Sequence, residues 1–167
     1  MKNKIIIIVS WLLVLLTMTM IYSFSDETSE ESTKTSGAVV EQILGIFMDK
    51  EDITPPVVKK YQFPIRKAAH FGIYMLLGFC MINAFDKSFK IKAYLNIVFS
   101  VISSCLYAVT DEIHQGYIAG RGPQVRDVLI DSSGAIVGVF IFVGLYFLYK
   151  KLILSKVDKI RKIKENN

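Results

Sequence analysis

Residues 107–131 read YAVTDEIHQGYIAGRGPQVRDVLID, a dense run of charged and polar residues between two strongly apolar stretches. The flanking stretches, about 93–110 and 128–149, are each long enough to cross a bilayer as a helix, which takes roughly 17–25 residues. Ionisable residues at the ends of membrane helices are costly to keep, so by default they indicate a functional site. The charged residues of this segment are therefore the first candidates for function.

The composition of the whole chain indicates a membrane protein. Hydrophobic residues make up 52% of it and the mean hydropathy is +0.41, with the apolar residues gathered in blocks. Two further blocks, about 5–24 and 68–85, are also long enough to span. Such blocks predict helices, because backbone polar groups in lipid must form hydrogen bonds within the segment. We expect an all-α polytopic membrane protein, one domain over residues 1–167 with a bundle of four transmembrane helices.

Basic residues predict how the chain is oriented in the cell membrane. Lys and Arg are in excess in segments 1–4, 86–92 and 150–167, while the remaining loops are acidic on balance. Loops rich in Lys and Arg stay in the cytoplasm, so both termini and the tail 150–167 should be cytoplasmic. The loops 25–67 and 111–127 should then lie outside. Membrane lipids are the expected partners, and nucleic acid is not, because no soluble module presents a basic face.

The first outer loop, 25–67, divides into three parts by composition. Residues 25–36 are acidic and polar without an apolar period, which predicts a flexible loop. Residues 37–50 carry apolar residues at helical spacing, so we expect a short amphipathic helix there. Residues 53–64 contain three prolines, which predicts an extended link into the second span.

Polar residues at the outer ends of three predicted spans should meet at one level. In the second span Arg66, His70 and Tyr74 share a helix face because they are four residues apart. The third span ends, and the fourth begins, with ionisable residues at the same level. A buried cluster of this kind is costly unless it is paired, so we expect the arginines to contact carboxylates. The predicted ligand-binding residues are Arg66, Lys67, His70, Asp111, Glu112, His114, Gln115, Arg121, Arg126, Asp127 and Asp131.

The fourth predicted span carries a stripe of acidic and small residues on one face. Asp127, Asp131, Gly134 and Gly138 recur at helical spacing, and the two glycines form a GxxxG pattern. Small residues at this spacing let a second helix backbone approach closely. We predict that Gly134 and Gly138 serve helix packing and that Asp131 lies against the neighbouring helix.

These motifs together resemble the VanZ-like family. The resemblance rests on RKAAHFGIYMLLG (66–78), DEIHQ (111–115), GR (120–121), RD (126–127) and DSSGAIVG (131–138). The stretch FSDETSEES (24–32) is similar to the serine-rich segment that follows the first span in that family. Ala119 stands where a proline often precedes GR, and Asp131 where asparagine is also usual. The resemblance implies a small bacterial multi-pass protein of the cell envelope, associated with low-level resistance to the glycopeptide teicoplanin.

Three hypotheses of different classes follow for the charged cluster. In the first, a non-enzymatic envelope protein binds a cell-wall precursor or a glycopeptide and changes antibiotic access. Its arginines and lysine would hold phosphate or carboxylate groups, which arginine contacts with two parallel hydrogen bonds. In a second hypothesis, the cluster is a lattice of ion pairs that locks the helix ends together and has no ligand.

The remaining hypothesis is a membrane enzyme that acts on a lipid-linked envelope precursor or a phospholipid head group. The candidate catalytic residues are His70, Asp111, Glu112 and His114. Asp111, His114 and Gln115 would share a face if the third helix continues one turn beyond residue 110. His70 and His114 could then meet as general acid and base, or, in a metal variant, as ligands. The chain contains no HExxH, GxSxG or P-loop sequence, so no metal or cofactor is expected.

Overall fold

The computed structural model describes residues 2–165, and the side-chain surroundings of residues 3–154. The elements in chain order are α1 (Lys2–Ser25), α2 (Ser29–Phe47), the 3₁₀ turn η1 (Lys50–Asp52), α3 (Pro55–Ser88), α4 (Ala93–Gln115) and α5 (Val125–Glu165). Four helices are long and apolar enough to span a membrane, over Asn3–Ser25, Pro55–Ser88, Ala93–Gln115 and Val125–Leu154. No strand occurs in the described chain. The predicted all-α polytopic membrane architecture is therefore confirmed.

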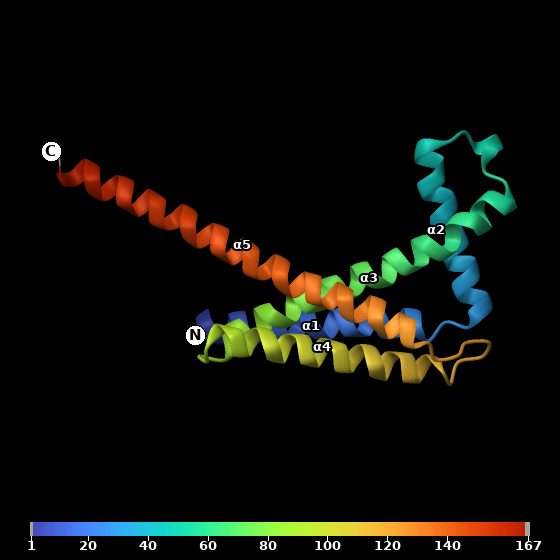
Figure 1. Cartoon of the computed structure of the whole chain (residues 1–167), viewed down its shortest axis with the longest axis horizontal. Coiled ribbons are helices and arrows are strands. Elements are labelled where there is room, and N and C mark those ends of the chain that lie inside the picture. Colours follow the sequence, from blue (N-terminus) through green and yellow to red (C-terminus); the bar gives the residue numbers. More distant parts are fainter. Residues whose placement is uncertain (1, 166–167) are drawn as a thin grey trace.

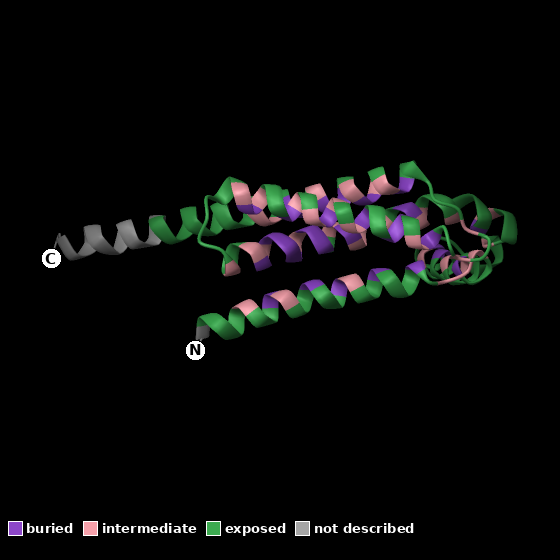
Figure 2. Ribbon diagram, turned by 90° about the horizontal axis from the view of Figure 1, so that it is seen from below, coloured by how far each residue is buried: buried purple, intermediate pink, exposed green. Residues whose placement is uncertain are grey.

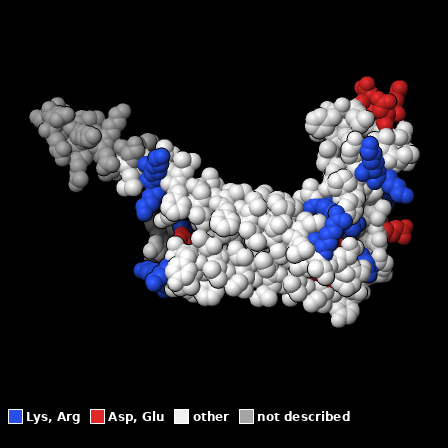
Figure 3. All heavy atoms as spheres, in the orientation of Figure 1, with Lys and Arg blue, Asp and Glu red and all other residues white. Residues whose placement is uncertain are grey.

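The four long helices lie side by side, and α2 projects with the start of α3 from one end of the bundle (Figure 1). We call this end, formed by residues 24–36, 65–74 and 111–131, the polar end. On the face seen in Figure 3, an uncharged band separates the charged groups at the two ends of the bundle. Of the predicted tail 150–167, the backbone continues α5 to residue 165, and the side chains from 155 onward lie outside the described residues.

The closest contact in the bundle joins α3 to α5, which run parallel from the polar end. A Cβ atom on Gly134 would overlap the backbone carbonyl of Phe71, and one on Gly138 would overlap that of Met75. From the other side, a Cβ on Gly78 would overlap the backbone of α5. The three glycines thus allow the two backbones to touch, which is how small residues serve membrane helix pairs.

The main apolar core lies along α3, between α1 and the other spans. Buried residues face inward on each helix, and the lipid-facing sides are exposed (Figure 2). Tyr74 and Leu77 are fully buried at its centre. The buried members of this core are Val14, Ile21, Tyr74, Leu77, Cys80, Met81, Ala84 and Ala108.

The helix α2 begins eight residues before the predicted amphipathic helix 37–50, so the prediction of a flexible loop over 25–36 is wrong for residues 29–36. The cause is a capping box: the Thr28 backbone N–H donates to Glu31 Oε2 at 2.9 Å, and the Glu31 N–H donates to Thr28 Oγ1 at 3.3 Å. These bonds satisfy amide groups that the first turn of a helix leaves free. The hydrogen bonds from Thr28 also lower the pKa of Glu31, so the cap is charged at neutral pH.

The predicted extended link over 53–64 is also wrong, because α3 starts at Pro55. Pro55 and Pro56 occupy the first helical turn, where no backbone donor is needed. Pro64 lies inside the helix and removes one donor there. This early part of α3 packs against α2 through a small second core of Val40, Leu44 and Val58. The burial of that core holds the helix together across its prolines.

We expect Gly138→Ala to destabilise the protein, because the added methyl group must push α5 away from the Met75 carbonyl. Overpacking of this kind costs about 1–3 kcal/mol, which a lower melting temperature of the detergent-purified protein would report. Gly144→Ala is the matched control in the same helix, since nothing lies within 4 Å of its Cβ position. Equal melting temperatures for the two variants would contradict the close α3–α5 contact.

Candidate functional site

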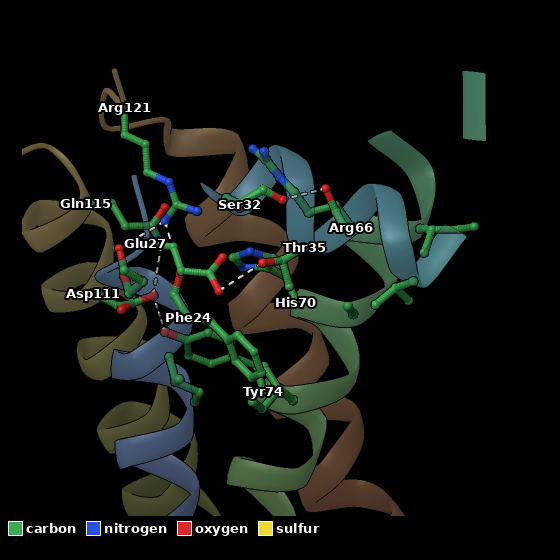
Figure 4. Close-up of a pocket in the computed structure, with 17 residues that line it drawn as sticks. Phe24, Glu27, Ser32, Thr35, Arg66, His70, Tyr74, Asp111, Gln115 and Arg121 are labelled. Atoms are coloured by element: carbon green, nitrogen blue, oxygen red, sulfur yellow. Dashed lines mark hydrogen bonds between the residues drawn. The ribbon is translucent and has the colours of Figure 1, made fainter. Parts of the chain in front are cut away.

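The polar end contains a cavity of about 200 Å³ between α1, α2, α3 and α4. Its floor is apolar and its upper walls carry charged and polar side chains (Figure 4). The last turn of α1, the following link and the turn before α5 complete the walls. The polar and charged residues that line it are Ser25, Glu27, Ser32, Thr35, Ser36, Arg66, His70, Tyr74, Asp111, Gln115 and Arg121.

Two arginines reach this cavity from different elements, Arg66 from α3 and Arg121 from the turn between α4 and α5. Arg121 Nη1 donates to the backbone carbonyls of Phe24 and Ser25, at 3.4 and 3.0 Å. Burial lowers the pKa of the Arg121 guanidinium below its usual range, and the nearby positive charge of Arg66 lowers it further. The two guanidinium groups are therefore close enough to repel each other within one partly buried space.

Two carboxylates line the same cavity and are held by hydrogen bonds from uncharged groups. Asp111 is 5% exposed, and its Oδ2 accepts from Tyr74 Oη at 3.0 Å and Gln115 Nε2 at 3.2 Å. Glu27 Oε1 accepts from Thr35 Oγ1 at 3.3 Å. Both carboxylates are thus oriented without an ion pair.

His70 stands between the cavity and a second, deeper carboxylate. Its ring lines the cavity, while Nδ1 lies 3.6 Å from Oδ1 of Asp131 on α5. Asp131 is 1% exposed, and neither of its oxygens accepts a hydrogen bond within the described residues. A buried carboxylate beside one imidazole nitrogen orients the ring.

Behind the cavity, polar contacts tie α3 and α4 to the start of α5. Lys67 Nζ donates to Asp127 Oδ2 at 2.5 Å, and both side chains are buried. Glu112 Oε1 accepts from the backbone N–H of Gln124 at 2.6 Å. Lys67, Asp127 and Glu112 form what we call the clasp. Lys67 and Asp127 pair with each other, Glu112 is held by a backbone amide, and none of the three lines the cavity. The clasp therefore supports the site from behind.

Besides the clasp residues and Asp131, two further predicted site residues do not line the cavity. The His114 ring stacks on Tyr22 with centroids 4.8 Å apart, and its Nε2 is 3.4 Å from Asp26 Oδ1. Arg126 lies over the Phe63 ring, 5.1 Å from its centroid. Residues 111–115, predicted as part of the outer loop, continue α4 to Gln115, but His114 turns toward α1 and does not line the cavity with His70.

The prediction that arginines contact carboxylates is wrong for the part of the chain whose side chains are described. The ion pairs there within 4 Å join lysines or histidines to acids, and none includes an arginine. No group of three or more His, Cys, Asp or Glu side chains in that part could hold a metal ion. The helix packing brings Lys67 to the position where an arginine was expected, because it sets which side of α3 faces α5.

Sequence reasoning missed the contribution of the stretch from the last turn of α1 into the first turns of α2. Glu27 and Thr35 line the cavity, and the backbone carbonyls of Phe24 and Ser25 bind Arg121. The Ser29 backbone N–H also donates to the Ala119 carbonyl at 3.2 Å, which joins this link to the α4–α5 turn. The serine-rich stretch 24–32 was a signal for this role, because the family resemblance already included it.

Comparison with known proteins gives one match. The family model described as VanZ/LLP1 matches residues 10–149, which include most of the first and fourth spans, all of the second and third, and every residue that lines the cavity. No curated protein and no solved structure matches the chain.

We expect Lys67→Met to destabilise the protein strongly, because it leaves Asp127 buried without its partner. Breaking a buried pair in this way costs about 3–5 kcal/mol, and the double variant Lys67→Met/Asp127→Leu should recover much of the loss. Thermal melting of the purified protein measures both effects.

The exposed pair of Lys87 and Asp86 provides the control, since its side chains are 39% and 36% exposed. Lys87→Met should change stability by no more than about 1 kcal/mol. A Lys67→Met protein that melts like Lys87→Met would show that the clasp contributes nothing to the fold.

Proposed function

Because the chain belongs to the VanZ/LLP1 family, we propose that it is a bacterial cell-envelope membrane protein that binds an amphiphile with a phosphate or carboxylate group and so modulates low-level glycopeptide (teicoplanin) resistance. One observation supports a ligand with an anionic group. Arg66 and Arg121 are half-buried in one cavity, and neither has a carboxylate within 4 Å among the described side chains. The site thus has two cationic groups and no counter-ion in contact with them.

The physical chemistry of arginine supports an oxyanion as the missing partner. A guanidinium group presents a planar set of donors that matches a phosphate or a carboxylate. Two such groups that repel each other in a partly buried space gain most from a ligand that contacts both. Among the arginines of the predicted site, Arg66 and Arg121 are the pair that lines the cavity.

The size and lining of the cavity support an amphiphile. Ligand pockets for drug-sized molecules usually measure roughly 300–1,000 Å³. At about 200 Å³ the cavity suits a head group, and its floor includes the apolar residues Ile21 and Ile73. We therefore propose that the direct ligand is a lipid-linked envelope molecule and that the effect on the much larger glycopeptide is indirect.

We further propose that the polar end faces the outside of the cell and both termini face the cytoplasm. Lys and Arg are in excess in the loop 86–92 and after the last span, which by the distribution of basic residues supports a cytoplasmic location for that end. In this orientation the cavity lies at the outer leaflet, on the side from which glycopeptides reach the cell.

A second candidate function, hydrolysis of the bound amphiphile, is favoured by the pairing of His70 with Asp131. The imidazole lines the cavity beside the arginines and lies 3.6 Å from a buried carboxylate. That arrangement would let His70 take a proton from a water molecule, while the arginines hold the anionic group. New products formed from added lipid, and absent with His70→Gln, would favour this function over binding alone.

We expect Arg66→Gln and Arg121→Gln each to weaken lipid binding by about tenfold or more, because a hydrogen bond to a charged group is lost. Native mass spectrometry of the detergent-purified full chain, titrated with phosphatidylglycerol, phosphatidylethanolamine and undecaprenyl phosphate, measures this loss. In cells that depend on the protein for resistance, the same variants should lower the teicoplanin concentration that stops growth.

Arg126→Gln is the matched control, since Arg126 lies over Phe63 outside the cavity. It should keep wild-type affinity. The proposal fails if no lipid binds, or if all three arginine variants bind equally well and have unchanged melting temperatures.

The proposed orientation predicts which loops react with a membrane-impermeant thiol reagent in intact cells. In a background without Cys80 and Cys105, Gln124→Cys at the polar end should be labelled from outside, because its side chain is exposed. Lys90→Cys, exposed in the loop between α3 and α4, should be labelled only after lysis. The reverse pattern would overturn the orientation and leave the cavity assignment untouched.

A further inference from the structure

The cavity holds groups of both charges that do not neutralise one another. Glu27 and Asp111 line it together with the two arginines, yet none of the described ion pairs within 4 Å joins these acids to those arginines. Contact between opposite charges in a partly buried space is stabilising, so some other interaction must keep these acids and arginines apart. A site that keeps both signs apart is suited to a ligand that itself carries both signs.

Hydrogen bonds to uncharged groups keep the charges apart. The carbonyls of Phe24 and Ser25 hold Arg121, while Thr35 holds one oxygen of Glu27. Asp111 is fixed in the same way by Tyr74 and Gln115, as described above. These partners are fixed by the ends of α1 and α4 and by α2, so the separation is built into the fold.

We infer that the ligand is a phospholipid with a zwitterionic head, in which a phosphate is linked to a primary ammonium group, as in phosphatidylethanolamine. This inference rests on the proposed function and names the lipid class. Arg66 and Arg121 bind the phosphate oxygens. The ammonium group donates to Glu27, a half-buried carboxylate whose Oε2 makes no hydrogen bond within the described residues. A primary ammonium fits this carboxylate because it has N–H donors, which a quaternary ammonium lacks.

Figure 4 shows the arrangement of these groups. Arg121 and Arg66 enter the cavity from opposite sides in this view, and Glu27 lies beside His70, below Arg121. The phosphate and ammonium sites are therefore neighbours within one cavity, as a head group with two linked charges requires. Asp111 lies deeper and already has two donors, so Glu27 is the carboxylate available to the ammonium.

An apolar groove next to the cavity provides the path for an acyl chain. It has a volume of about 380 Å³ and lies between α1 and α4, where Val14 and Met18 face Leu106 and Tyr107. The groove lies close to the cavity, because the ring centroid of Tyr107 in the groove is 6.3 Å from that of Tyr74 in the cavity.

The distance from the polar end to the groove, measured along α1, is close to the hydrocarbon thickness of one leaflet. From Ser25 to Val14 the helix α1 rises about 16 Å at roughly 1.5 Å per residue. That distance is close to half of the roughly 30 Å hydrocarbon core, so an acyl chain of the surrounding leaflet fits. A charged cavity with an apolar groove close beside it favours an intact phospholipid over a free head group.

The test is to titrate the detergent-purified full chain with four phospholipids of identical acyl chains. Native mass spectrometry measures the binding of each lipid. Phosphatidylethanolamine should bind about tenfold or more tightly than phosphatidylglycerol, phosphatidic acid and phosphatidylcholine, because only its head offers both a phosphate and N–H donors. Glu27→Gln should remove this preference, whereas Arg66→Gln should weaken the binding of all four lipids to the same extent. Free phosphoethanolamine should bind more weakly than phosphatidylethanolamine. Leu106→Trp, which fills the groove, should weaken binding of the lipid but not of free phosphoethanolamine.

Glu30→Gln is the matched control, because Glu30 is exposed and is not part of the cavity lining. Glu27→Asp, which keeps the charge, should retain part of the preference, and melting temperatures establish that each variant is folded. Equal or tighter binding of phosphatidylglycerol or phosphatidic acid overturns the zwitterion inference but leaves the proposed anion site standing. Loss of the preference in Glu30→Gln overturns the role of Glu27, and failure of every lipid to bind removes both proposals.

Discussion

The close parallel contact of α3 with α5 is the constraint on which the rest of the structure depends. Without side chains at Gly78, Gly134 and Gly138, the two backbones touch, and the vertical register of the helices is fixed. That register brings Asp127 level with Lys67, and Asp131 level with His70. Because lipid offers no hydrophobic force between helices, such packing has to come from shape, and the glycines provide it.

Much of the architecture could be predicted from the sequence, since apolar blocks reveal membrane spans by length alone. The helical segments 29–36 and 55–64 could not, because polar composition and prolines outweighed two local signals. The first signal was Thr28 followed three residues later by Glu31, and the second was the Pro-Pro pair at the start of α3. Both are start signals for a helix, which the packing of α2 against α3 then stabilises.

The level of the charged residues was predictable, but their pairing was not. Neighbouring residues on a helix point about 100° apart, so small rotations decide which partner each one meets. His114 faces α1, while Gln115, the next residue, faces the cavity. The arginines, expected at carboxylates, contact backbone carbonyls, an aromatic ring or the open cavity. The polar end therefore has two sets of charges: a set in ion pairs that holds helices together, and a set that lines the cavity without ion pairs among the described side chains.

The distance in sequence between Lys67 and Asp127 has a consequence for how the protein is made. The two side chains are 60 residues apart, so α3 leaves the ribosome well before its charged partner exists. Until α5 inserts, Lys67 and His70 have to stay in the interfacial water, because an unpaired charge in the hydrocarbon core is costly. Insertion of the last span thus supplies the acidic partners of Lys67 and His70, and a chain truncated before residue 125 would leave both side chains without them.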